Sequence, residues 1–237
     1  MTRSRIPGTA AVLLALALPV TAQVPPAQQA AIASPQPGAA TGPNPIQGRR
    51  IAAIGGSGGA AACAQCHGLD GTADGSGAFP RLSAQAAYYL YKQLGDYASG
   101  ARQNAIMGPI ARALSDAERQ DVASYYAALD SPYFPAPTVT TEALQRGGTL
   151  SALGASDRGV QACVNCHGPA ALGQAPAIPQ LAGQYAAYIR TQFQMFRGDF
   201  RRNDIAGVMR DISRRLSDDD VAAVAAYLET IRPGSAR

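Results

Sequence analysis

Residues 63–68 read CAQCHG, and residues 163–168, one hundred positions further along, read CVNCHG. Together the two motifs contain all four cysteines and both histidines of the 237-residue chain. On a turn of helix, residues three and four positions apart lie on one face, so Cys63, Cys66 and His67 can all point toward a single flat group. The same holds for the second motif, and the rest of the sequence is arranged around these two points.

The Cys-x-x-Cys-His spacing is typical of covalent haem attachment, in which two thiols bind the vinyl groups and the imidazole binds the iron. A thioredoxin-like thiol pair would need a βαβ setting, which neither motif has. A zinc site would need a fourth ligand, and two disulfides would leave the adjacent histidines without a role. The sequence therefore predicts two haem c groups bound through Cys63, Cys66, Cys163 and Cys166, with His67 and His167 as iron ligands.

The first 22 residues predict a secretory signal peptide, with a basic start at Arg3 and Arg5, an apolar core at 10–18 and small residues at 20–22. The core is too short to span a bilayer. Retention of the signal as an anchor is the alternative, and it leaves membrane association open. Residues 23–46 are rich in Pro, Ala and Gln and carry no charge, so they are predicted to be a flexible leader. We therefore expect an exported, periplasmic protein.

The formal net charge of +4 overstates the basic character of the mature protein. Removal of residues 1–22 takes away two arginines and no acid, which lowers the charge to +2. Ionised propionates on two haems bring the total to about −2, by summation of charges. Nucleic acid is therefore not a predicted partner.

A repeated pattern occupies residues 47–130 and 141–237, with a Pro-rich linker at 131–140 between the copies. Helices are predicted within 47–61, at 84–99 and at 115–129, and again at 142–153, 185–197 and from 217 onward. Equivalent residues lie 99 positions apart at Pro80/Pro179, Gln85/Gln184, Gln93/Gln192, Arg102/Arg201 and Asn104/Asn203, and 102 apart at Met107/Met209. The chain is thus predicted to be all-α, a tandem duplication of one small domain around a haem.

Each haem iron needs a second axial ligand, and both histidines are already used. Methionine is the expected choice, and Met107, Met195 and Met209 remain after loss of the signal peptide. Met107 and Met209 lie in equivalent loops, each seven residues before a Leu-Ser pair that opens the last helix. Met195 falls inside a predicted helix, opposite Asp96 of the first copy, and is expected to pack rather than to ligate. We predict Met107 and Met209 as the ligands.

This order of motifs, twice over about residues 47–232, resembles the dihaem class I cytochromes of the cytochrome c4 family. The resemblance implies two small helical domains related by a pseudo-twofold axis, with the haem propionate edges facing each other. It also implies that the carbonyl groups of Pro80 and Pro179 accept hydrogen bonds from the rings of His67 and His167. Arg102 and Arg201 would lie near the propionates or the methionine loops. Solvated surface arginines are the alternative.

With both axial positions filled, outer-sphere electron transfer is favoured over substrate activation, so we expect a carrier and not an enzyme. The resemblance implies transfer from a quinol-cytochrome c reductase to a terminal oxidase. The alternative is a dihaem electron-transfer subunit of a periplasmic or membrane dehydrogenase. A dihaem peroxidase would need a further histidine, and a sensor would need one methionine to be absent or labile.

Basic residues surround the second methionine loop and could dock an acidic partner. The alternative is an ordinary charged face balanced by Asp199, Asp204 and Asp211. The basic residues are Arg197, Arg201, Arg202, Arg210, Arg214 and Arg215.

Overall fold

The structure, a computed structural model, describes residues 42–233. The predicted signal peptide and most of the predicted leader lie outside this range. Among the described residues the regular structure is helical, with isolated bridges and no β-strand. No helix in the described range is both long enough and apolar enough to cross a membrane.

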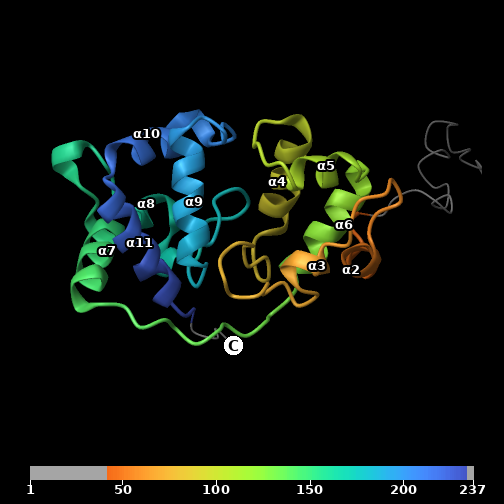
Figure 1. Cartoon of the computed structure of the whole chain (residues 1–237), viewed down its shortest axis with the longest axis horizontal. Coiled ribbons are helices and arrows are strands. Elements are labelled where there is room, and N and C mark those ends of the chain that lie inside the picture. The colour runs from red at the N-terminus through yellow and green to blue at the C-terminus, as the bar shows by residue number, and fades with distance from the viewer. Residues whose placement is uncertain (1–41, 234–237) are drawn as a thin grey trace, which may run out of the picture. The chain divides into compact units, whose positions relative to one another are not determined.

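The same order of helices occurs twice, as Figure 1 shows on either side of the extended segment at 131–140. The first half contains α2 (Pro45–Ile54), α3 (Ala64–His67), α4 (Ala87–Ser99), α5 (Met107–Arg112) and α6 (Asp116–Ala127). The second half contains α7 (Thr141–Leu153), α8 (Val164–His167), α9 (Ala186–Arg197), α10 (Val208–Arg215) and α11 (Asp218–Thr230). Its 3-10 turns are η2 (Ser156–Arg158), η3 (Pro169–Ala171) and η4 (Ile205–Gly207). The predicted all-α duplication is confirmed.

Helix starts follow from capping side chains. Ser115 and Ser217 each form a capping box with the residue three positions later, which confirms the predicted openings of α6 and α11. Helix α2 begins at Pro45, two residues before the predicted domain start, because the Asn44 side chain accepts hydrogen bonds from the first turn. Helix α4 begins at Ala87 and not at 84, because Ala84 has a φ of +61° and cannot continue a right-handed helix.

The first and last helices of each half cross at a glycine. A Cβ on Gly48 would lie 2.0 Å from the carbonyl oxygen of Asp121, and a Cβ on Gly147 would lie 2.3 Å from that of Ala223. Only glycine permits this approach, which brings α2 onto α6 and α7 onto α11. Each half therefore has its own apolar core beside its cysteine motif, bordered by Cys63 in the first half and by Cys163 in the second.

The two halves also contact each other directly. Arg102 and Arg201 form an antiparallel bridge, in which the Gln103 amide donates to Phe200 O (2.7 Å) and the Arg202 amide donates to Ala101 O (2.8 Å). Because equivalent segments pair with each other, the contact has approximate twofold symmetry, as the resemblance implied.

Candidate haem sites

The cysteine motifs form single helical turns, α3 and α8. His67 donates its backbone N–H to Cys63 O at 2.9 Å, and His167 does the same to Cys163 O at 2.9 Å. The glycine after each histidine has a positive φ, +71° at Gly68 and +75° at Gly168, which turns the chain away from the site. All four cysteines carry free thiols. The turn therefore presents the thiols and the imidazole as the spacing predicted.

Both imidazoles are buried, and each has one nitrogen occupied. Nδ1 of His67 lies 3.2 Å from Pro80 O, and Nδ1 of His167 lies 2.9 Å from Pro179 O. A carbonyl oxygen can only accept, so Nδ1 carries the hydrogen and Nε2 is left to bind iron. Burial lowers the pKa of both histidines, which keeps the imidazoles neutral, as ligation requires. The predicted proline contacts are confirmed.

Burial has the opposite effect on the pKa of the first thiol in each motif. It raises the pKa of Cys63 to about 11 and also raises the pKa of Cys163. A thiol held in its neutral form is a poor thiolate ligand, so the setting of the first cysteine in each motif fits thioether attachment better than zinc binding.

Each predicted methionine ligand lies at the start of a short helix and not in an open loop. Met107 is the first residue of α5, and its N–H donates to Asn104 Oδ1 at 2.8 Å. Met209 is the second residue of α10 and packs against the same core as Cys163. Met195 lies inside a helix, as expected from the sequence, and belongs to the last turn of α9. Ligation by Met107 and Met209 stays a prediction.

The surface alternative for Arg102 and Arg201 is wrong. Only 3% of Arg102 and 7% of Arg201 is exposed. The Arg102 guanidinium donates to Gln93 in its own half and to Tyr188 and Gln192 in the other half. The Arg201 guanidinium reciprocates by donating to Gln192 in its own half and to Tyr89 and Gln93 across the contact. The two arginines therefore hold the halves together.

These guanidinium groups donate hydrogen bonds only to neutral oxygens, and they lie over the rings of Tyr97 and Phe196. The nearest acid in the network, Asp96, is paired with Lys92 and with Asn203. Burial alone would raise the pKa of Tyr89, but the charges of Arg201 and Arg102 outweigh it and lower that pKa. A buried cation without a counterion is costly, so the network fits an anionic group brought in from outside the chain. Haem propionates have that charge, and the residues present thus fit the predicted cofactor.

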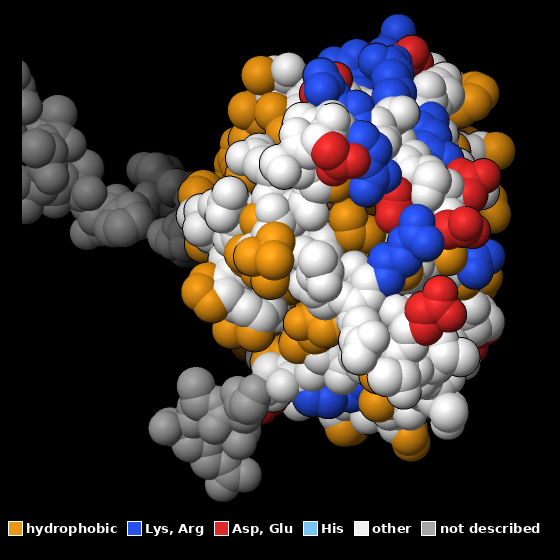
Figure 2. All heavy atoms as spheres, turned by 90° about the vertical axis from the view of Figure 1, so that its left-hand side faces the viewer, with side chains coloured by type: hydrophobic (Ala, Val, Ile, Leu, Met, Phe, Trp, Pro, Cys, Tyr) orange, Lys and Arg blue, Asp and Glu red, His pale blue; other side chains and the backbone are white. Residues whose placement is uncertain are grey.

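The arginines around the second methionine are largely balanced. Arg210 pairs with Asp204 (2.9 Å) and Arg214 with Asp199 (2.7 Å). The remaining pairs are Arg215 with Asp211 and Arg197 with Asp218. Figure 2 shows basic and acidic side chains interspersed on the side of the molecule that it presents. The pairing favours the balanced-face alternative over a uniformly positive docking face.

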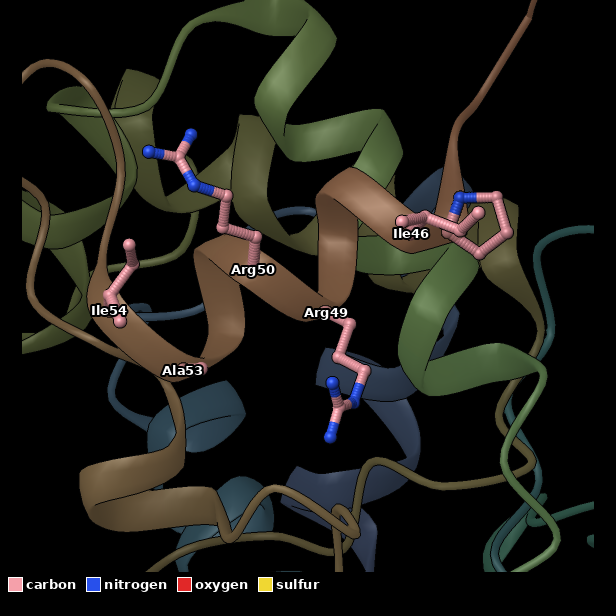
Figure 3. Close-up of a pocket in the computed structure, with 6 residues that line it drawn as sticks. Ile46, Arg49, Arg50, Ala53 and Ile54 are labelled. Carbon is pink, nitrogen blue, oxygen red and sulfur yellow. The ribbon is translucent and has the colours of Figure 1, made fainter.

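A shallow pocket on the outer side of α2 contains none of the predicted site residues. It is lined by Pro45, Ile46, Arg49, Arg50, Ala53 and Ile54 (Figure 3). The candidate site is therefore the buried region around each histidine and not this surface.

Four polar residues of the site escaped sequence reasoning, which had used them only to align the repeats. They are Gln85, Gln93, Gln184 and Gln192. A signal was present, because uncharged polar side chains at equivalent positions beside apolar helix faces indicate a shared buried role.

Comparisons with known proteins agree with this geometry. The Cytochrome c family profile matches residues 55–130 and 157–232. A thiosulfate dehydrogenase electron acceptor of Stutzerimonas stutzeri (strain A1501) is 44% identical over 185 residues, which are 78% of this chain and 86% of that protein. A cytochrome c4 of Thiocapsa roseopersicina is 40% identical over 169 residues, 70% of this chain and 85% of that protein. A solved thiosulfate dehydrogenase from Marichromatium purpuratum gives a TM-score of 0.72 at 32% identity, over 81% of this chain and 41% of that chain.

Proposed function

The chain belongs to the cytochrome c family and is similar to cytochrome c4, and we propose that it is a periplasmic electron carrier. Its two haem c attachment motifs carry this role, and a dehydrogenase is the proposed electron donor. The haems supply one-electron chemistry when bound. The residues of the chain attach them, orient them and exclude water from them. The chain itself makes and breaks no substrate bonds in this role.

The assignment as a carrier rests on the ligand sets. We propose His67 with Met107 for the first iron and His167 with Met209 for the second. Each histidine is buried and has its Nδ1 bonded to a proline carbonyl, so Nε2 is the nitrogen that would bind the metal. An iron with two strong axial ligands has no position for a substrate, which favours outer-sphere transfer.

The assignment of the electron donor rests on the names of two similar proteins. The 44% identical relative is a thiosulfate dehydrogenase electron acceptor. In the Marichromatium purpuratum enzyme, a segment similar to this chain forms 41% of a thiosulfate dehydrogenase polypeptide. Both favour a thiosulfate dehydrogenase as donor over a quinol-cytochrome c reductase, which is the second candidate. A terminal oxidase is the proposed acceptor, and export through residues 1–22 is proposed on the signal pattern.

A direct test is reduction of the purified, oxidised dihaem protein, followed through the visible absorption of reduced haem c. One sample receives thiosulfate and a purified thiosulfate dehydrogenase. A second receives a quinol and a quinol-cytochrome c reductase, and controls omit each enzyme. We expect rapid enzyme-dependent reduction in the first sample.

Reduction only in the second sample would contradict the proposed donor.

Repeating the first assay at increasing salt concentration tests the arginine face of α9 and α10. Because its charges are paired within the chain, we expect a shallow salt dependence. A steep fall in rate would instead support docking of an acidic partner at residues 197–215.

A further inference from the structure

The peptide bond between Pro80 and Arg81 has two hydrogen-bonding partners. Its carbonyl oxygen, on Pro80, accepts from Nδ1 of His67 at 3.2 Å. Its N–H, on Arg81, donates to Oε1 of Gln184 at 3.0 Å. Gln184 belongs to the other half of the molecule. One planar amide group therefore connects the first axial histidine to a side chain of the second half.

The second half has the mirror arrangement. The peptide bond between Pro179 and Gln180 accepts from Nδ1 of His167 at 2.9 Å and donates to Oε1 of Gln85 at 2.9 Å. Gln85 and Gln184 are equivalent residues of the repeat. Each half thus contributes one glutamine, which accepts a hydrogen bond from the peptide that contacts the axial histidine of the other half.

Both glutamines are fixed by a second bond. The side-chain amide of Gln184 donates to Arg81 O at 2.9 Å, and that of Gln85 donates to Gln180 O at 3.1 Å. Only 7% of Gln184 and 8% of Gln85 is exposed. A two-point contact in a buried interface holds the peptide plane in one orientation, and with it the direction of the carbonyl that the imidazole faces.

Hydrogen bonds in series strengthen one another. When the N–H of a peptide donates, electron density moves toward its carbonyl oxygen, which then becomes a better acceptor. A better acceptor at Nδ1 makes the imidazole a stronger donor of electron density to its metal. Because the glutamine and the histidine come from different halves, this effect crosses the interface.

We propose that Gln85 and Gln184 are positioning residues that tune the haem of the opposite half through the peptide that holds its axial histidine. Gln184 acts on His67, and Gln85 acts on His167. Each glutamine stabilises the ferric state of the opposite haem and so lowers its reduction potential. The inference rests on haem ligation by the two histidines and is independent of the electron donor.

The test uses the intact dihaem protein with nitrogen-15 in its histidines. The chain has only two histidines, so the reduced, diamagnetic protein gives two ring Nδ1–H signals, which can be assigned through their proline neighbours. We expect Gln184→Leu to shift the His67 signal toward that of a weaker hydrogen bond and to speed its exchange with solvent, with the His167 signal unchanged. Gln85→Leu should do the reverse. In redox titrations, each variant should raise the potential of the opposite haem.

Tyr188→Phe is the matched control. It removes a different bond across the interface, the one to Arg102, and should leave both Nδ1–H signals in place. If Gln184→Leu does not fold, Gln184→Glu keeps an acceptor for Arg81 and should shift the His67 signal in the opposite direction.

Two results would overturn the proposal. One is a glutamine variant that moves the histidine of its own half or both histidines equally. The other is a pair of folded variants that move neither signal. Because no electron donor is present, these outcomes say nothing about thiosulfate oxidation and stay separate from the proposed function.

Discussion

The two halves support their methionines differently although they share one pattern. In the first half Asn104 Oδ1 accepts from the backbone N–H groups of Ile106 (2.9 Å) and Met107 (2.8 Å), so Met107 sits directly on the turn that starts α5. In the second half η4 adds three residues before Met209. The equivalent Asn203 instead donates across the interface to Gln93 and Asp96.

Asp204 replaces the asparagine as local support in the second half. It accepts from the backbone N–H of Arg210 at 3.0 Å and from the Arg210 side chain at 2.9 Å. Duplication has therefore preserved the proposed iron ligands while the contacts that support the two methionines diverged. We infer that the two haems are not equivalent, since ligand orientation contributes to the potential of each iron.

The largest expected effect comes from the glycines at the helix crossings, which both halves contain. Gly48→Ala and Gly147→Ala force a Cβ against backbone oxygens of α6 and α11. We expect each to lower the free energy of unfolding by about 3 kcal/mol or more. Gly95→Ala in α4 is the control, because nothing lies within 4 Å of its Cβ. It should stabilise by about 0.5–1 kcal/mol.

Thermal and denaturant unfolding of the haem-loaded variants measures these effects. A large loss in only one glycine variant would show that the two crossings are not equivalent. A Gly95→Ala variant as unstable as the other two would contradict the role of close helix approach.

A smaller difference in stability between the halves is expected at the capping box of the last helix in each half. Asp220 is 2% exposed and pairs with Arg146 and Arg158, whereas its counterpart Glu118 is only half-buried. We expect Asp220→Asn to lower the free energy of unfolding by about 2 kcal/mol. Glu118→Gln should cost at most about 1 kcal/mol.

The pH dependence of unfolding tests the contribution of both carboxylates, Glu118 and Asp220. Hydrogen bonds from Ser57 and Ser115 lower the pKa of Glu118 to about 2. Burial alone would raise the pKa of Asp220, but its bonds from Arg158 and Arg146 hold that pKa well below its usual range. A carboxyl with a depressed pKa contributes stability above its unfolded pKa and loses it as pH falls.

Stability should therefore decline as pH falls below about 4.5, the ordinary value for Glu118, and the decline should be shallower in each variant than in the wild type. An Asp220→Asn variant with an unchanged acid profile would show that this carboxylate does not stabilise the second half.

The sequence was sufficient for the local features. The cysteine spacing placed the thiols and the histidines on one helical turn, and the repeat arithmetic identified Met107 and Met209 as equivalent residues. Even the change in offset from 99 to 102 corresponds to a real element, the three-residue turn η4. Capping boxes predicted the starts of α6 and α11 because they involve residues only three positions apart.

The buried polar roles that sequence reasoning missed depend on contacts between the halves. The burial of Arg102 comes from Tyr188 and Gln192, 86 and 90 positions away. The role of Gln85 comes from Gln180, 95 positions away. Arginine and glutamine are usually exposed, so the residue type alone predicts a surface position. Only the folded structure shows that these side chains are buried between the two halves.

The central claim is that each half holds its own iron between a histidine and a methionine. Near-infrared absorption of the oxidised protein tests it, through the charge-transfer band from methionine sulfur to ferric iron. We expect the band in the wild type, and loss of about half its intensity in Met107→Ala and in Met209→Ala. A band that survives unchanged in either variant, or that has half the expected wild-type intensity, would contradict the claim for that haem and reopen the sensor alternative.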